Sequence, residues 1–285
     1  MRTDVTNATN ETGHAPSNPS QAMLRIAEDY ERWFVPPIGT PSARRVVDAA
    51  RIDAGDRVLD LACGTGVAAR LAAEHAGPTG SVVGVDANPA MVEVADRAAP
   101  ELEWHTGVAE DLPFDEASFD VVVCSLGFQF FADKPAALSE IARVLASDGR
   151  VALGTPGPTP PLMVAIDGAL ADHVGPEASG FVHAVFSVHD REQVTGLLGA
   201  AGFVDVETDA RPLPLRVPPP AEFFWQYVHS TPLAMLAAGL DDDARAALER
   251  DVVERCRPFV DGDGAVMEPN LLVATARRRR EAGQP

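Results

Sequence analysis

The sequence predicts an α/β fold, in which a doubly wound, mostly parallel, seven-stranded sheet is preceded by N-terminal helices and has a helical insertion before its last strand. Three observations predict it. Apolar runs without polar alternation occur at 57–62, 81–85 and 119–125, as expected for strands buried on both faces. Helical segments and turn residues separate these runs, which is typical of parallel sheets. A glycine-rich loop, Cys63–Gly66, joins the first strand to a helix.

The N-terminal region divides into a polar leader and two helices. Residues 1–20 are rich in Asn, Thr and Ser and contain no apolar segment, so we expect a disordered leader rather than a secretory signal. From residue 21 an apolar stripe at helical spacing runs to Phe34, and Pro36-Pro37 should end that helix. A second short helix is predicted over 42–52.

The segment from 56 to 155 alternates strands with helices. Asn88, followed by proline, is expected to cap the second helix, which runs to about residue 98. An Asp-Gly turn at 148–149 precedes the last strand of the series. The predicted strands are 57–62, 81–85, 102–106, 119–125 and 150–155, and the predicted helices are 67–75, 88–98 and 133–145.

After residue 155 the pattern is less regular. A proline-rich break at 155–161 precedes helices at 162–174 and 190–201, a strand at 204–208 and an extended stretch at 212–220. Two further helices, 221–240 and 243–257, form the insertion before a last strand at 270–276. We therefore expect one domain over 21–277, followed by a tail at 278–285. Its parts are N-terminal helices (21–55), a cofactor-binding core (56–155), and acceptor-side helices with the last strands (156–277).

The chain is strongly acidic. Its 285 residues include 42 acidic and 23 basic residues, for a formal net charge of −19, and one lysine, Lys134, stands beside 22 arginines. Such an excess favours solubility. Adaptation to a salt-rich cytosol is one hypothesis for it, and a GC-rich genome that exchanges lysine for arginine is the other. Unfolding measured from low to multimolar KCl separates them, because a halophilic protein loses stability at low salt.

Composition also excludes several classes of protein. No basic patch indicates binding to duplex nucleic acid. No apolar run reaches the roughly 18 residues of a membrane helix. Three distant cysteines form no disulfide framework, and the histidines show no metal-ligand spacing, so no metal is expected. We predict a cytoplasmic protein that is a monomer or a homodimer.

The glycine loop and an acid that follows it indicate a nucleoside-containing cofactor. Gly64-Thr-Gly66 follows a strand and opens a helix, and Asp86 ends the next strand, 20 residues after Gly66. A carboxylate at that place can accept hydrogen bonds from both ribose hydroxyls. The glycine pattern alone does not distinguish a dinucleotide from another nucleoside cofactor.

Asp60, at the end of the first strand, favours one of these cofactors. Its negative charge would repel the pyrophosphate of a dinucleotide. S-adenosylmethionine (SAM) carries an ammonium group and a sulfonium instead, which an acid attracts. The alternative is that Asp60 only accepts hydrogen bonds from backbone amides of the loop. An NAD-dependent oxidoreductase is further disfavoured because no Tyr-x-x-x-Lys pair is present.

Four motifs in order resemble the class I SAM-dependent methyltransferases, in the branch grouped with the ubiquinone and menaquinone biosynthesis enzymes. They are VLDLACGTGVAARLA (58–72), GVDANPAMVEVA (84–95), GVAEDLPFDEASFDVVVCSLGFQFF (107–131) and ALSEIARVLASDGRVAL (137–153). The resemblance covers about 21–155 well. It implies a Rossmann-like methyltransferase fold, SAM as cofactor and S-adenosylhomocysteine as its product.

The resemblance also implies roles for individual residues. Asp60 and the loop would surround the methionine part of SAM, and Asp86 would bind the ribose. Val108 stands where the family commonly has Asp, which removes one contact to the adenine amino group. The segment from Ser125 to Phe128 would lie under the transferred methyl group. The implied cofactor residues are Asp60, Cys63, Gly64, Thr65, Gly66, Asp86, Ala87, Met91, Ala109, Glu110 and Ser125.

The methyl acceptor is less defined. Methyl transfer needs alignment and exclusion of water more than it needs a base, so no catalytic residue can be identified with assurance. Tyr30 is a candidate for a lid or a hydrogen bond, or else an ordinary helix aromatic, and Gln129 is a candidate for the acceptor side, or else a polar loop residue. Aromatic residues in 221–260 either fill a small core or line a pocket, which indicates a small, partly hydrophobic acceptor.

Two further alternatives stay open at this point. A nucleic-acid methyltransferase that acts on adenine usually carries Asn/Asp-Pro-Pro-Tyr/Phe after the fourth strand, where this chain has Cys124-Ser-Leu-Gly-Phe128. A gel shift would test that alternative. A SAM-binding regulator without catalysis would retain the same cofactor motifs, and only an activity measurement distinguishes it from an enzyme.

Overall fold

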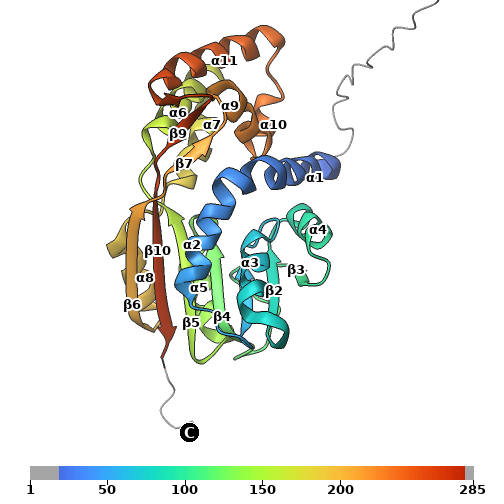
Figure 1. Cartoon of the computed structure of the whole chain (residues 1–285), viewed down its shortest axis with the longest axis vertical. Helices are drawn as coiled ribbons and strands as arrows, with labels where there is room; N and C mark the ends of the chain where they lie inside the picture. Colours follow the sequence, from blue (N-terminus) through green and yellow to red (C-terminus); the bar gives the residue numbers. More distant parts are fainter. Residues whose placement is uncertain (1–18, 280–285) are drawn as a thin grey trace, which may run out of the picture.

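The computed structural model describes residues 19–279, and at its centre lies the predicted seven-stranded sheet (Figure 1). The strand order is β3-β2-β1-β4-β5-β10-β6. Neighbours from β3 to β5 are parallel, whereas β10 runs antiparallel to both β5 and β6. The predicted strands are confirmed as β1 (Arg57–Leu61), β2 (Ser81–Asp86), β3 (Glu103–Thr106), β4 (Phe119–Ser125), β5 (Leu145–Pro156), β6 (Phe203–Pro212) and β10 (Asn270–Arg278).

Helices cover both faces of the sheet. Val58 and Val121 face the layer of α2 and α3, whereas Leu59 and Val122 face α5 and α8. This burial on both faces explains why the strand sequences are apolar without alternation. No helix within 19–279 combines the length and the apolarity needed to cross a membrane. The helices around the sheet are α1 (Pro19–Asp29), α2 (Thr40–Ala50), α3 (Val67–Ala76), α4 (Pro89–Ala98), α5 (Lys134–Val144) and α8 (Arg191–Ala200).

The N-terminal helix does not end at Pro36-Pro37, so that prediction was wrong. A π-helical segment, η1 (Tyr30–Gly39), contains both prolines and joins α1 to α2. The backbone N–H of Thr40 donates to Val35 O, five residues back, as π-helical bonding requires. A proline disrupts α-helical bonding because it lacks an N–H and because its ring is bulky. The wider turn of the π-helix accommodates both Pro36 and Pro37. The result is one continuous helical run from Pro19 to Ala50. It passes between the sheet and the upper part of the molecule (Figure 1).

A second unit, which we call the cap (161–185 and 213–269), lies above the strand ends (Figure 1). The predicted insertion is present, but it also carries the small sheet β7-β9-β8. One predicted helix, 221–240, is broken at Ser230-Thr231-Pro232, and α7 was not predicted. Cap elements are α6 (Pro161–His173), α7 (Pro176–Val185), β7 (Leu215–Val217), α9 (Pro220–His229), α10 (Leu233–Ala237), α11 (Asp242–Cys256), β8 (Val260–Asp261) and β9 (Gly264–Met267).

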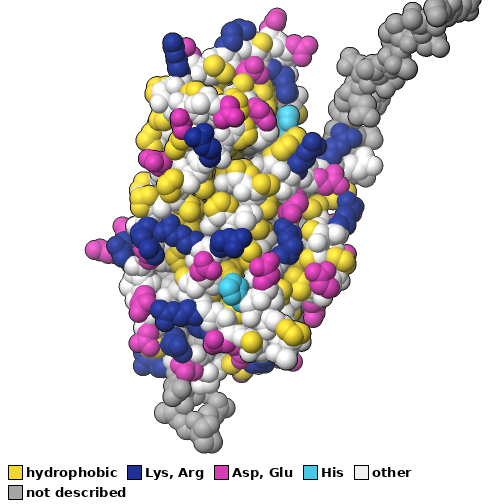
Figure 2. All heavy atoms as spheres, viewed as in Figure 1, with side chains coloured by type: hydrophobic (Ala, Val, Ile, Leu, Met, Phe, Trp, Pro, Cys, Tyr) yellow, Lys and Arg dark blue, Asp and Glu magenta, His cyan; other side chains and the backbone are white. Residues whose placement is uncertain are grey.

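Charged side chains do not form one large patch on the face shown in Figure 2, where acidic and basic groups are interspersed. Ion pairs join several of them, such as Arg57 with Asp120 (2.8 Å) and Arg70 with Glu31 (2.8 Å). The formal charge of −19 is therefore a weak guide to partners, since much of it lies on solvated surface.

The indole ring of Trp104 on β3 explains why positions 66 and 84 are glycines. A Cβ added to Gly84 or to Gly66 would overlap its indole ring, and the ring is fixed by a hydrogen bond from Nε1 to Ala99 O (2.9 Å). We expect Gly84→Ala to lower the free energy of unfolding by about 2 kcal/mol through overpacking. Gly180→Ala in α7 is the control, because a Cβ there meets nothing within 4 Å and should be neutral or stabilising. Urea unfolding of both variants measures the difference, and equal stabilities would show that Trp104 yields without cost.

Candidate functional site

The predicted cofactor residues gather at the edge of the sheet where the parallel strands end. Asp60 lies near the end of β1, Asp86 ends β2, and Ser125 ends β4. The Cys63–Gly66 loop follows β1 and leads into α3. Carboxyl ends of neighbouring strands in such sheets form the usual ligand crevice. The sequence motifs, distant along the chain, thus meet at one place.

The glycine loop is held by Asp86. Gly64 and Gly66 have φ values of +55° and +85°, which an L side chain rarely adopts. The N–H of Gly64 donates to Asp86 Oδ2 (2.8 Å), and the N–H of Asn88 donates to Oδ1 (2.9 Å). Burial raises the pKa of Asp86, and these two hydrogen bonds oppose the rise. A carboxylate has about four acceptor positions, so Asp86 retains capacity for ribose hydroxyls.

Asp60 has one oxygen in use and one free. Its carboxyl is 1% exposed, and Oδ2 accepts a hydrogen bond from Ala69 N–H in α3 (2.7 Å). Oδ1 is buried without a hydrogen-bond partner. Burial raises the pKa of this carboxyl to about 7. One sequence interpretation is thus met, because Asp60 binds a backbone amide, and the attraction of its second oxygen to a cationic group of SAM stays a prediction.

The residues predicted near the adenine border the same edge. Ala87 is exposed, whereas Ala109 is 6% exposed in the core beneath. Met91 packs with α1 residues beside α4, so the N-terminal helix covers this side. Glu110 Oε1 accepts a hydrogen bond from the N–H of Asp133 (3.1 Å), and Val108 is 48% exposed. Glu110 is thus fixed to the start of α5.

Tyr30 and Gln129 lie in different surroundings. The Tyr30 ring stacks on Phe34, with the ring centroids 4.5 Å apart. The ring also lies close to Gly64, since a Cβ added to that glycine would be 3.7 Å from Tyr30 Cε1. Tyr30 thus lies over the glycine loop. Burial, together with the charges of Asp86, Glu31 and Asp60, raises the pKa of its phenol. Gln129 instead donates from Nε2 to Leu126 O (2.7 Å), while its Oε1 is buried without a hydrogen-bond partner.

Lys134, the single lysine of the chain, is partly buried. Its ammonium group donates to the carbonyls of Gln129 (3.1 Å) and Phe131 (3.0 Å). Together with the side chain of Gln129, it fixes the turn that follows β4. These contacts give both residues a local structural task next to the strand end.

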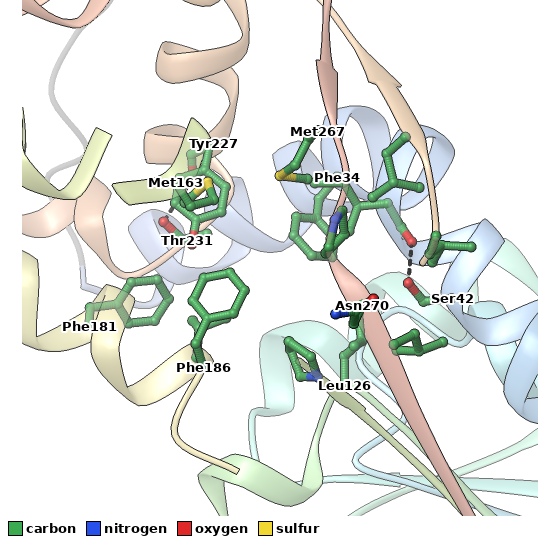
Figure 3. Close-up of a pocket in the computed structure, with 17 residues that line it drawn as sticks. Phe34, Ser42, Leu126, Met163, Phe181, Phe186, Tyr227, Thr231, Met267 and Asn270 are labelled. Atoms are coloured by element: carbon green, nitrogen blue, oxygen red, sulfur yellow. Dashed lines mark hydrogen bonds between the residues drawn. The ribbon is translucent and has the colours of Figure 1, made fainter. Parts of the chain in front are cut away.

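An apolar pocket lies beside the cofactor edge, between the sheet, η1 and the cap (Figure 3). Its cavity volume is about 90 Å³. Because one water molecule needs roughly 10–15 Å³ of such volume, the cavity has room for several waters. The lining residues, drawn from nine helices and strands and the loops between them, are Phe34, Ile38, Ser42, Leu126, Pro156, Met163, Phe181, Val185, Phe186, Leu213, Leu215, Tyr227, Thr231, Met267, Pro269, Asn270 and Leu271.

Two of the four polar side chains that line this pocket already donate hydrogen bonds within the protein. The Ser42 hydroxyl donates to Ile38 O (2.8 Å), and the Thr231 hydroxyl donates to Tyr227 O (2.9 Å), both drawn in Figure 3. Burial raises the pKa of the Tyr227 phenol, so it stays protonated at neutral pH. The surface offered to a ligand is therefore apolar, with a phenol at one wall and Asn270 at the mouth.

Sequence reasoning identified only part of this pocket. Aromatic residues in 221–260 were expected to fill a small core or line a pocket, and one of them, Tyr227, lines the cavity together with Phe34 of η1. Met163, Phe181 and Met267 were missed, because nothing near them in the sequence distinguishes a pocket wall from core. For Met163 and Phe181 the apolar spacing on a helix was the available signal, and it fits both roles. Met267 lies on the short strand β9, which was not predicted.

Comparison with known proteins points to one family. Residues 58–149 match the family model described as a methyltransferase domain. A nocamycin O-methyltransferase from Saccharothrix syringae is 33% identical over 265 residues, which cover 86% of this chain and 93% of that protein. A demethylmenaquinone methyltransferase from Lactobacillus johnsonii is 38% identical over 151 residues, 50% of this chain and 62% of that protein.

A solved structure has the same fold. Phosphoethanolamine N-methyltransferase 2 from Haemonchus contortus, in complex with phosphomonomethylethanolamine and S-adenosylhomocysteine, has a TM-score of 0.58 to this chain at 18% identity. The match covers 92% of this chain and 58% of that one. At this identity the likeness concerns the fold.

Proposed function

Because the chain belongs to the class I SAM-dependent methyltransferases, in the branch of the ubiquinone and menaquinone enzymes, we propose that it methylates a small hydrophobic acceptor. The acceptor binds in the apolar pocket between the sheet and the cap. We assign 56–155 to the cofactor, and 156–277 together with the N-terminal helices to the acceptor. The cap has a cluster of buried side chains of its own, which supports a separate acceptor side, whereas α8, β6 and β10 pack with the sheet.

One observation carries the proposal: the apolar pocket adjoins the cofactor edge. Leu126, which lines the pocket, directly follows Ser125 at the end of β4. Phe34, also in the lining, stacks on Tyr30, which lies over Gly64. An apolar cavity beside a cofactor crevice is the usual place for a hydrophobic substrate.

The chain's own residues would bind, orient and shield the reactants. When bound, SAM supplies a methyl group on a positively charged sulfur. Asp60, with its free oxygen, and Asp86 would hold the methionine and ribose parts. The pocket walls would exclude water and align the acceptor, which is the main requirement for this transfer. Tyr227, protonated at neutral pH, can donate a hydrogen bond to an acceptor oxygen but does not act as a base.

The proposal is tested by methyl transfer from labelled SAM to a matched panel of acceptors. The panel pairs apolar aromatic hydroxyl compounds with hydrophilic ones, namely 2-naphthol and a hydroxynaphthoquinone against catechol and free serine. Products are assigned by mass spectrometry, which also identifies the methylated atom. Transfer to the apolar members supports the proposal, whereas transfer confined to the hydrophilic ones contradicts it.

Met163→Trp should block the pocket without disturbing the cofactor. Met163 is 2% exposed and lines the cavity from α6, so an indole there occupies acceptor space. We expect acceptor turnover to fall about tenfold or more, while SAM affinity measured by calorimetry stays within about twofold, since one methylene-sized misfit is already worth about 10-fold or more. Val164→Trp, next along α6 but 55% exposed, is the matched control. Equal loss in both variants would place the acceptor elsewhere.

A further inference from the structure

The N-terminal helical run holds the cofactor loop through a network of three side chains. Glu31 on η1 accepts a hydrogen bond from the Thr65 hydroxyl at Oε2 (2.5 Å) and pairs with Arg70 of α3 through Oε1 (2.8 Å). Arg70 also donates to the backbone carbonyl of Thr65 (2.7 Å). Glu31 is 34 residues from Thr65 in sequence, so the network joins distant segments.

The network is well placed to control the loop's conformation. Thr65 is 0% exposed and lies between Gly64 and Gly66, whose positive φ values give the loop its shape. The side chains of Glu31 and Arg70 are 30% and 26% exposed, so water competes only partly for their hydrogen bonds. Both the hydroxyl and the carbonyl of Thr65 are fixed, which leaves the loop little freedom to turn.

Tyr30, which precedes Glu31 in the sequence, is held in place by the contacts of Glu31 with Thr65 and Arg70. Tyr30 lies over Gly64 and stacks on Phe34, which lines the acceptor pocket. Arg70 also acts on the acid at the end of β1, because its charge lowers the pKa of Asp60 against the larger effect of burial. Losing Glu31 would therefore loosen the loop, release Arg70 and weaken the placement of Tyr30.

We propose that Glu31 is a positioning residue, which keeps the Cys63–Gly66 loop in its SAM-binding conformation through Thr65 and Arg70. The inference rests on the proposed location of the SAM site at this loop. Glu31 itself acts through the loop and needs no contact with SAM. The contribution of Glu31 to SAM affinity does not depend on the acceptor, so it can be measured with SAM alone.

The test is SAM affinity measured by calorimetry in Glu31→Gln and Glu31→Ala. The glutamine side chain would keep an oxygen for the Thr65 hydroxyl but lose the charge that pairs with Arg70. We expect SAM affinity to fall about threefold in Glu31→Gln and about tenfold in Glu31→Ala, as is typical of a lost charge-assisted hydrogen bond. In a double-mutant cycle, Glu31→Ala with Arg70→Ala should cost no more than about the larger single change, because both residues act in one network.

Glu28→Gln is the matched control. Glu28 lies on the same helical run and pairs with Arg97 of α4 (2.9 Å), away from the loop, with both side chains about half exposed. It should leave SAM affinity unchanged. Equal losses in Glu28→Gln and Glu31→Gln would mean that general helix docking matters and would overturn the proposal, as would unchanged affinity in Glu31→Ala.

Two controls keep the outcomes distinct. Thermal unfolding verifies that each variant is folded, and Thr65→Val, nearly isosteric, should reproduce the loss in the folded protein if the hydroxyl contact matters. If the wild-type chain itself fails to bind SAM, the proposed function falls. If the wild type binds and Glu31→Ala binds equally well, only the positioning role falls.

Discussion

Asp86→Ala is expected to weaken SAM binding by about 100-fold. Two charge-assisted hydrogen bonds from ribose hydroxyls would be lost, each worth about 1.5–3 kcal/mol. The variant also frees the N–H of Gly64, which donates to Asp86 in the folded protein, so the loop loses an anchor in addition to the ligand contact. Asp86→Asn keeps an acceptor oxygen and should lose less affinity, about tenfold.

Calorimetric titration with SAM and with S-adenosylhomocysteine measures the effect in both variants. Asp120→Ala is the control, because Asp120 lies at the start of β4 and pairs with Arg57 at the opposite edge of the sheet. It should cost stability and leave SAM affinity intact. A folded Asp86→Ala protein with full SAM affinity would show that the ribose lies elsewhere and would refute the site map.

Asp60→Asn is expected to stabilise the ligand-free protein at high pH and, at the same time, to abolish most SAM binding. Burial raises the pKa of Asp60 from 3.8 to about 7, so the folded state stays protonated where the unfolded chain is ionised. The free energy of unfolding therefore falls as pH rises between these two values, by about 4 kcal/mol at about 1.36 kcal/mol per pKa unit. An asparagine removes this cost but also removes the charge that attracts SAM.

Urea unfolding at about pH 6 and about pH 8.5 measures the stability part. Wild type should lose about 1 kcal/mol between these values, because only the last unit of the titration window lies above pH 6. Asp60→Asn should change less and exceed the wild type at the higher pH by up to about 4 kcal/mol. SAM binding should be at least about 50-fold weaker in the variant. Binding to wild type below about pH 7 should also release a proton, seen as a dependence of the calorimetric heat on buffer. A variant with lower stability at the higher pH and unchanged SAM affinity would contradict both parts.

Much of the sheet was predictable because its signals are local. A buried parallel strand leaves an uninterrupted apolar run, and β4 was predicted with its observed bounds, Phe119–Ser125. Asn88 was predicted as a helix cap, and its side chain accepts from Ala90 N–H (3.0 Å). Asp60 and Asp86 stood out because glycine spacing fixes where the strands end.

The misjudged parts depend on distant contacts. The rule that proline ends a helix describes an isolated α-helix. Pro36 and Pro37 instead lie inside the π-helical segment η1, which packs against the cap and the Cys63–Gly66 loop. The pocket could not be predicted as a set, because its walls come from segments between Phe34 and Leu271. The shape of such a cavity depends on how distant helices and strands pack against one another, so no local sequence pattern predicts it.

Because the continuous run α1–η1–α2 touches both the cofactor loop and the proposed acceptor pocket, we expect the two ligands to affect each other's binding. The run touches the loop through Glu31 and the pocket through Phe34 and Ile38. Any shift of this helix that favours one ligand changes the free energy of binding the other. By thermodynamic reciprocity, the factor by which SAM tightens acceptor binding equals the factor by which the acceptor tightens SAM binding. Release of either product should then hasten departure of the other.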